Sequence, residues 1–274
     1  MERLEREEKL RRAKQVATAA AEAAGRYAKE RFLTTYDVTE KDEHGDLVTD
    51  VDVEAERLIL ETIRASFPHD AIRSEETGWS GVEGDWLWLV DPLDGTNNFA
   101  IGLPAFGVAI TLLYRKEPVV GVVYESVTER MYAAVAGQGA TCNGVPLDAS
   151  GAGTVKPLRN RTVGWIQGHR VQKEPGAMRL KSLLDESCKR ALRLWAPALL
   201  WTMLARGQLD GIVLYDSEGD DLYAGVLIAK EAGAAVLRFD GTPFDGMDES
   251  PYLVAGRGDV PEQLLRLAKD ASSA

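Results

Sequence analysis

The chain has 274 residues, of which 45% are apolar and 27% are charged, and its formal net charge is −11. This length allows one large domain or two of ordinary size, with enough apolar residues for a core. The acidic balance argues against a protein that binds duplex nucleic acid, because phosphate contacts need a basic face, but a metal ion or a local pocket could still attract a small anionic substrate.

The N-terminal part of the chain predicts two helices. Residues 3–33 are rich in Ala, Glu, Lys and Arg, with apolar residues at helical spacing. The start of this segment is charged throughout and lacks the apolar core of a signal peptide. A second helix is predicted from near Val53, because apolar residues recur at helical spacing as far as Phe67 and Pro68 follows.

An apolar, strand-like run at residues 86–90 leads directly into the motif "DPLDGTNNF". Two carboxylates, Asp91 and Asp94, therefore follow a strand and precede a glycine. Short polar turns then separate further strand-like segments, which predicts an antiparallel meander. These segments are residues 106–114, 118–126 and 130–137.

The turn-rich residues 150–160 are the best candidate for a boundary between two domains, 1–150 and 151–274. Beyond them strands and helices alternate, which is typical of an α/β layer. The predicted strands are 162–168, 191–195, 211–215, 234–239 and 252–256. The predicted helices are 178–189, 197–206, 221–232 and a last one from Pro261. The predicted fold class is therefore α/β, in an α+β layered arrangement.

Acidic residues occur in pairs at four places where a simple fold would not need them. The pairs are Asp50 and Asp52, Glu75 and Glu76, Asp91 and Asp94, and Asp220 and Asp221. Each pair has a structural explanation: Asp52 suits a helix N-cap, the last pair suits a helix start, Glu75 and Glu76 suit a solvated loop, and "DPLDG" suits a turn. Taken together the pairs favour a site, because three of the four directly follow an apolar strand-like or turn element.

Convergent carboxylates would need protons or cations. Each close pair repels by roughly 4 kcal/mol at about 4 Å with an effective dielectric constant near 20. An all-oxygen site favours Mg²⁺ or Mn²⁺ over zinc, and the three histidines, His44, His69 and His169, have no metal-ligand spacing and are expected at the surface. The backbone N–H groups of Gly95 and Thr96, at the start of a predicted short helix, would donate hydrogen bonds to a phosphate. The pattern predicts metal-assisted phosphoryl hydrolysis.

These motifs resemble those of the inositol monophosphatase family of Mg²⁺-dependent, lithium-sensitive phosphatases. "DPLDGTNNF" resembles its central motif, "SEE" its upstream glutamate motif, "DLVTDVD" its threonine–aspartate motif and "DDLYAGVLIAKEAGA" its C-terminal aspartate helix. The resemblance covers residues 10–260, with all motifs in order. It implies the five-layer αβαβα sugar-phosphatase sandwich and a homodimer, with most metal ligands in residues 1–150 and with Asp221 and the substrate-reading loops in residues 151–274.

The resemblance also implies metal ligands. Glu75, Asp91 and the Leu93 carbonyl would hold a first Mg²⁺. Asp91, Asp94 and Asp221 would hold a second, and Glu75 with waters would hold a third. Mn²⁺ would be a possible substitute.

Catalytic and substrate-binding roles follow from the same resemblance. Thr96, paired with Asp52, would orient the water nucleophile on the metal ions, and Glu75 would take part in catalysis as a ligand of those ions. The amides of Gly95 and Thr96 would bind the phosphate. Asp221 and Lys41 would complete the substrate site.

Three departures from the family pattern fall in the segment that is expected to recognise the substrate. Asp220 replaces a tryptophan and adds a charge, and Ala196-Pro197 replaces Gly-Ser or Gly-Thr at a helix start. Leu214 stands where inositol-hydrolysing members have a glutamate. We expect Leu214 to face the substrate, so that inositol 1-phosphate is not the best one, and nearby carboxylates to favour a substrate with an amine.

Several alternatives stay open. The substrate could be fructose 1,6-bisphosphate, a 3′-phosphonucleotide, histidinol phosphate or an aminosugar phosphate. The protein could also be a non-catalytic metal- or phosphate-binding protein of the same fold, although the Asp52–Thr96 pair argues against this because a sensor has no need to activate water.

Two further features predict the location of the protein. Cys142 and Cys188 form no paired-cysteine metal motif, which favours a reducing compartment. No apolar run approaches the roughly 20 residues of a membrane span. We expect a cytoplasmic protein whose partner is a small phosphate ester, not a nucleic-acid polymer or a membrane.

Overall fold

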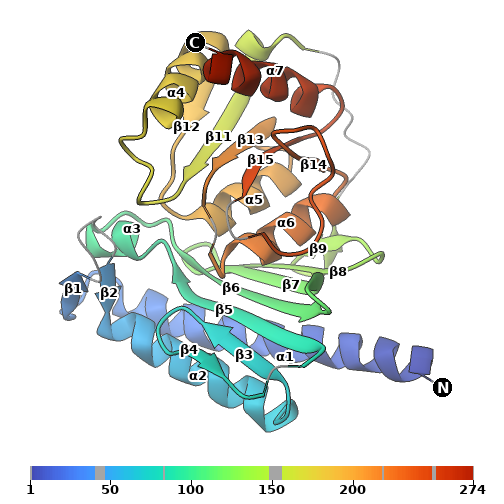
Figure 1. The fold of residues 1–274 in the computed structure, drawn as a ribbon. Helices are drawn as coiled ribbons and strands as arrows, with labels where there is room; N and C mark the ends of the chain where they lie inside the picture. Colours follow the sequence, from blue (N-terminus) through green and yellow to red (C-terminus); the bar gives the residue numbers. More distant parts are fainter. Residues whose placement is uncertain are drawn as a thin grey trace.

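The computed structural model describes residues 2–40, 47–82, 84–147, 156–217, 219–248 and 251–273. In these ranges the chain forms five layers in the order helices, sheet, helices, sheet, helices (Figure 1). The predicted αβαβα sandwich is therefore confirmed. None of the helices in these ranges is both long and apolar enough to cross a membrane.

The first layer consists of α1 (Glu2–Arg31) and α2 (Asp50–Ser66), which pack on each other and on the first sheet. Helix α2 begins three residues before the predicted start, because Thr49 caps it. The Thr49 hydroxyl accepts from the backbone N–H of Val51, and the Asp52 carboxylate accepts from the Thr49 N–H, which makes a capping box. The N-cap role considered for Asp52 is therefore wrong, since Asp52 lies in the first turn.

The first sheet has eight strands in the order β10-β9-β8-β7-β6-β5-β3-β4. Only β3 and β5 are parallel, and β6, β7 and β8 form the predicted meander. Its strands are β3 (Ala71–Ser74), β4 (Gly78–Ser80), β5 (Trp86–Asp94), β6 (Gly107–Tyr114), β7 (Glu117–Glu125), β8 (Arg130–Val135), β9 (Ala140–Cys142) and β10 (Val145–Pro146). Because helices cover both faces, β6 is buried along almost its whole length. A separate antiparallel pair joins β1 (Val38–Glu40) to β2 (Leu47–Thr49).

The middle layer is formed by α5 (Pro197–Ala205) and α6 (Leu222–Glu231), which lie between the two sheets. Close approach depends on two glycines. A Cβ atom at Gly225 would lie 2.6 Å from the Cβ of Trp201, and one at Gly121 would lie 2.9 Å from the carbonyl oxygen of Ala224. The absence of side chains at these positions lets α6 approach both α5 and the first sheet, and so brings Asp221 toward the end of β5.

The second sheet has five strands in the order β12-β11-β13-β15-β14, and α4 and α7 cover its outer face. The elements are β11 (Thr162–Gln167), β12 (Arg190–Leu192), β13 (Gly211–Tyr215), β14 (Ala235–Arg238), β15 (Tyr252–Gly256), α4 (Pro175–Ser187) and α7 (Val260–Ser273). Strand β11 is parallel to β12 and β13, and the other pairs are antiparallel. The predicted strand 191–195 is too long, because β12 ends at Leu192. The predicted boundary at 150–160 falls partly outside the described residues, so the division into two domains stays a prediction.

Candidate functional site

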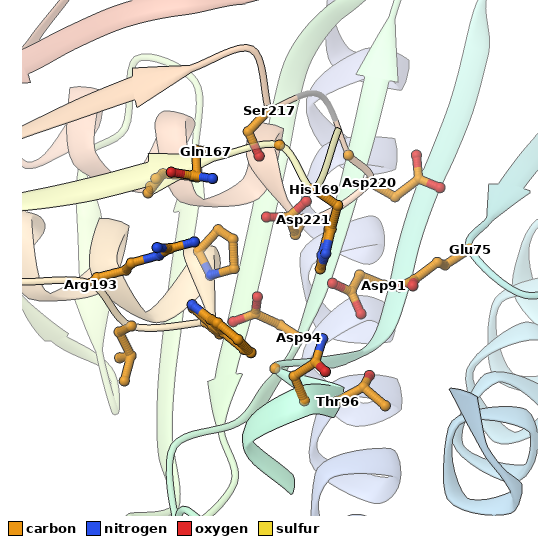
Figure 2. Close-up of a pocket in the computed structure, with 18 of the residues that line it drawn as sticks. Glu75, Asp91, Asp94, Thr96, Gln167, His169, Arg193, Ser217, Asp220 and Asp221 are labelled. Carbon is orange, nitrogen blue, oxygen red and sulfur yellow. The ribbon is translucent and has the colours of Figure 1, made fainter. Parts of the chain in front are cut away.

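An open pocket of about 330 Å³ lies between the two sheets, at the end of β5 and the starts of α3 (Thr96–Ala100), α5 and α6. Most of the predicted site residues line it, and Figure 2 shows the carboxylates of Asp91, Asp94 and Asp221 pointing into the same space. The predicted residues at its wall are Glu75, Asp91, Leu93, Asp94, Gly95, Thr96 and Asp221. Asp52 lies behind Thr96, and Lys41 lies outside the described residues.

The "DPLDG" motif is a bulged strand end, not the ordinary turn considered above. The pairing of β5 with β6 runs to Asp91, shifts, and resumes at Asp94. Within the bulge the Leu93 N–H donates to the Asp91 carboxylate at 2.9 Å. Gly95 then reverses the chain with a φ of 95°, and a Cβ there would lie 2.9 Å from the Ala105 carbonyl oxygen. A glycine is therefore required for both conformation and space.

The side chain of Asp94, which belongs to β5, also caps the N-terminus of α5. The backbone N–H groups of Ala198 and Leu199, in the first turn of α5, donate to its two carboxylate oxygens at 3.3 and 3.4 Å. Ala196 precedes the helix and offers no side-chain cap, and Pro197 at its first position lacks an N–H that would otherwise need an acceptor. A carboxylate from another element thus caps α5, whose own N-cap residue offers no capping side chain.

Thr96 and Asp52 form the predicted pair. The Thr96 hydroxyl lies 2.8 Å from Asp52 Oδ1 and 2.9 Å from the Leu93 carbonyl oxygen, so it can donate to either. The other oxygen of Asp52 accepts from the N–H and the hydroxyl of Thr49. Burial raises the pKa of Asp52 to about 6, although the hydrogen bonds from Thr49 and Thr96 oppose the rise.

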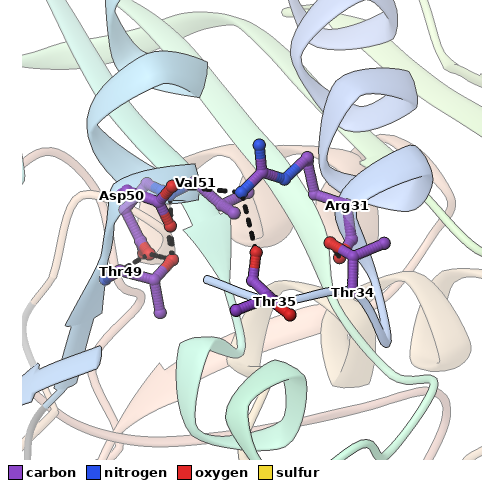
Figure 3. A network of polar contacts seen from close by, with 7 residues as sticks. Arg31, Thr34, Thr35, Thr49, Asp50 and Val51 are labelled. Atoms are coloured by element: carbon purple, nitrogen blue, oxygen red, sulfur yellow. Dashed lines mark hydrogen bonds and ion pairs between the residues drawn. The ribbon is translucent and has the colours of Figure 1, made fainter. Parts of the chain in front are cut away.

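The start of α2 is tied to the end of α1, which fixes Asp52 further. Figure 3 shows Arg31 at the centre of this contact. Its guanidinium donates to the Asp50 carboxylate and to the Thr35 carbonyl oxygen, both at 3.1 Å. Asp52, which lies behind Thr96, is thus anchored in part through the exposed Asp50 two residues before it.

A buried residue that the sequence did not single out holds Glu75. The carboxylate of Glu56, on α2, is 1% exposed and accepts from the Ser74 hydroxyl and from the N–H groups of Glu76 and Thr77. The Glu75 N–H donates to the Val90 carbonyl oxygen at 3.1 Å. The turn that carries Glu75 is therefore held by two elements: by the Glu56 side chain of α2 and by the backbone of β5.

The electrostatics of the pocket favour a cation. Burial raises the pKa of Asp91 well above its usual value, and the charges of Glu75, Asp94 and Asp221 raise it further. The pKa of Asp94 is raised by burial and by Asp221, against the opposing effect of the α5 N–H groups. In the described part of the chain no three acidic, His or Cys side chains already lie close enough together to hold an ion. The oxygen-only donors fit Mg²⁺ in kind.

One expectation about the substrate side is wrong, and the charge that Asp220 adds is balanced by a neighbour. Leu214 is 1% exposed and packs in the core between the sheets, so it does not face the pocket. Asp220 lines the pocket, but the Arg73 guanidinium lies 2.6 Å from its carboxylate and neutralises the added charge. Several other polar or aromatic lining residues lacked a sequence signal, since each is an isolated residue in or after an ordinary strand: Trp165, Gln167, His169, Gln172, Arg193, Trp195 and Ser217. His169 is exposed as expected, but it also lines the pocket.

Comparison with known proteins gives a consistent result. A family model described as "Inositol monophosphatase family" matches residues 8–273. The chain is 37% identical to "Phosphatase IMPL1, chloroplastic" of Arabidopsis thaliana over 81% of its length, a match that spans only 61% of the plant protein. It is 32% identical to the "Fructose-1,6-bisphosphatase/inositol-1-monophosphatase" of Aquifex aeolicus, over 96% of this chain and 97% of that protein. The structure of an inositol monophosphatase from Anabaena superposes with a TM-score of 0.83, at 29% identity, over 96% of this chain and 97% of that one.

Proposed function

Because the chain belongs to the inositol monophosphatase family, and is therefore a phosphoric monoester hydrolase, we propose that it hydrolyses a small phosphate ester with the help of Mg²⁺ ions in the pocket at the end of β5. One observation carries this proposal. The buried carboxylates of Asp91 and Asp94, at the end of β5, share one pocket with the carboxylates of Glu75 and Asp221, although their charges oppose one another. Such an arrangement costs stability unless cations occupy it.

The ligands would be the residues that the sequence predicts. The side chains of Glu75, Asp91, Asp94 and Asp221 and the carbonyl of Leu93 would hold two or three Mg²⁺ ions, with Mn²⁺ as a substitute. When bound, such ions place positive charge on the phosphate oxygens and make a bound water more acidic. The N–H groups of Gly95 and Thr96 would donate hydrogen bonds to the phosphate. Lys41, which lies outside the described residues, stays a predicted substrate-binding residue.

Thr96 and Asp52 would move the proton of the attacking water. While the Thr96 hydroxyl donates to Asp52, its oxygen lone pairs can accept a hydrogen bond from a water in the pocket. A proton can thus pass from the water to Thr96 as the Thr96 proton passes to Asp52. A carboxylate whose pKa is about 6 is ionised at neutral pH and is still basic enough to take this proton. The products are the alcohol and inorganic phosphate.

The direct test is phosphate release from a panel of phosphate esters, with Mg²⁺ and with excess chelator. We expect turnover only with Mg²⁺, and inhibition by lithium. Turnover that persists in chelator would refute the metal mechanism. Binding of esters without any release of phosphate would favour the alternative of a non-catalytic sensor.

We also propose a homodimer, on the basis of an exposed apolar patch. Leu33 and Ile101 are each 73% exposed, and Leu103 is 41% exposed. Leu33 packs against Gly102, so the three side chains form one patch at the ends of α1 and α3. Patches of this kind are typical of an interface between subunits. The cytoplasmic location stays a prediction, with which two free cysteines, Cys142 and Cys188, are consistent.

A further inference from the structure

The pocket has a second wall, opposite the carboxylates, and Gln167 and Arg193 lie on it (Figure 2). The orientation of the Gln167 amide is fixed by its neighbours. Its oxygen accepts from the Trp165 indole N–H at 2.8 Å and from the Lys181 ammonium at 3.1 Å. Both neighbours can only donate, so the amide cannot flip, and its NH₂ group must face away from them.

This NH₂ group lacks an acceptor. Gln167 Nε2 is buried and has no hydrogen-bond partner among the described residues. Figure 2 shows the amide at the edge of the space between the wall and the carboxylates. A buried donor without an acceptor is costly, and in a native structure it calls for an explanation such as a ligand.

Arg193 brings a cation to the same wall. Its guanidinium lies 5.6 Å from the centre of the Trp195 ring, and no carboxylate of the described residues forms an ion pair with it. Arg193 is an exposed residue of the open pocket, and partial burial of its guanidinium lowers its pKa. Lys181 stands behind Gln167 and adds a second positive charge.

We propose that Gln167 and Arg193 bind a second anionic group, a carboxylate or a phosphate, on the alcohol part of the substrate. This inference rests on the proposed function, because it assigns the first phosphate to the metal side of the pocket. A guanidinium beside an amide NH₂ offers several donors and no acceptor, which suits a carboxylate or a phosphate. The predicted preference for an amine is reversed here, since an ammonium group would meet Arg193 and Lys181.

The test compares esters that differ only in the second group. For the carboxylate, 3-phosphoglycerate is compared with glycerol 1-phosphate. For the phosphate, fructose 1,6-bisphosphate is compared with fructose 1-phosphate. We expect the anionic member of at least one pair to lead in kcat/KM by roughly tenfold to a hundredfold, and the pair that does so identifies the group. Equal values in both pairs would overturn the inference.

Two variants test the residues themselves. Arg193→Met removes the charge and keeps a long side chain, and Gln167→Glu keeps the acceptor for Trp165 and Lys181 while it replaces the NH₂ group by oxygen. Each should reduce the preference for the anionic member by about tenfold or more, mainly through KM, because the contact is the same before and during reaction. Arg170→Met, a charge change at an exposed residue outside the pocket lining, is the matched control. An equal loss of kcat/KM for both members of a pair, or an equal effect of the control variant, would show that Gln167 and Arg193 do not bind a second anionic group.

A binding measurement separates this inference from the proposed function. Calorimetry with Mg²⁺ compares 3-phosphonopropionate with propylphosphonate, which cannot be hydrolysed. A tighter Kd for the first, lost in Arg193→Met, supports the inference even if no ester is hydrolysed. Equal Kd values with normal hydrolysis of neutral esters would overturn the inference and leave the proposed function intact.

Discussion

Replacement of Asp52 by asparagine should lower the rate of hydrolysis and, at neutral pH, raise the stability of the protein relative to the wild type. Asp52 accepts three hydrogen bonds, one from Thr96 and two from Thr49. An asparagine side chain has a single acceptor oxygen, which can face either Thr49 or Thr96. The two donors of Thr49 favour the orientation in which this oxygen faces Thr49. The new NH₂ group would then face Thr96, whose hydroxyl would turn to donate to the Leu93 carbonyl oxygen, 2.9 Å away. No base would remain for the proton.

The expected loss of rate is large, and the effect on stability is in the opposite direction. Removal of a general base costs roughly a hundredfold or more in kcat. Burial raises the pKa of Asp52 from 3.8 to about 6, so the folded protein binds this proton more tightly than the unfolded chain does. The unfolding free energy of the wild type therefore falls as pH rises from 4 to 7, by about 2 kcal/mol from this group. The unfolding free energy of the Asp52→Asn protein does not show this fall, because asparagine does not titrate.

The assay has two parts. Rates of phosphate release with Mg²⁺ are compared across pH, where the wild type should lose activity below about pH 6 as Asp52 is protonated. Urea unfolding of the metal-free proteins at pH 4 and pH 7 should show the variant gaining about 2 kcal/mol relative to the wild type over this range. Asp270→Asn, at an exposed residue of α7 that does not line the pocket, is the control and should behave like the wild type. A variant that keeps a tenth of the wild-type rate, or whose relative stability does not change with pH, would refute this reasoning.

Three other changes test the site and the assembly. Asp91→Asn should lower the rate at least about a hundredfold, which corresponds to roughly 2.7 kcal/mol, while the metal-free protein unfolds no earlier; a near wild-type rate would contradict a metal role. Glu56→Gln should weaken Mg²⁺ activation by about tenfold, because the Glu75 turn loses a charged acceptor, whereas Glu54→Gln on the exposed face of α2 should not. Ile101→Asp should convert a dimer to a monomer in light scattering, and Val82→Asp, at another exposed apolar residue, should not; a wild-type monomer would end the dimer proposal.

The sequence by itself determined the fold class and the acidic half of the pocket. Residues 91–96 are contiguous, so one bulged strand end places two carboxylates and a threonine hydroxyl at the same pocket whatever packs around them. The long helix, the meander and the alternating C-terminal half were likewise readable, because periodicity is a local property. The short strands β3 and β4 were missed, since three or four residues are too few to show a period.

Only the tertiary structure decided what surrounds the carboxylates. Arg73 neutralises Asp220 across 147 positions of the chain, and Glu56 holds the Glu75 turn across about 20. Leu214 was expected at the substrate, but it lies within a strand whose inner face packs on the middle helices, and no local spacing indicates which face that is. The orphan NH₂ of Gln167 depends on two donors from different elements that fix its amide. Apart from the contact between Trp165 and Gln167, these contacts join residues of different elements, so local patterns do not encode them, and they exist only once the layers have packed.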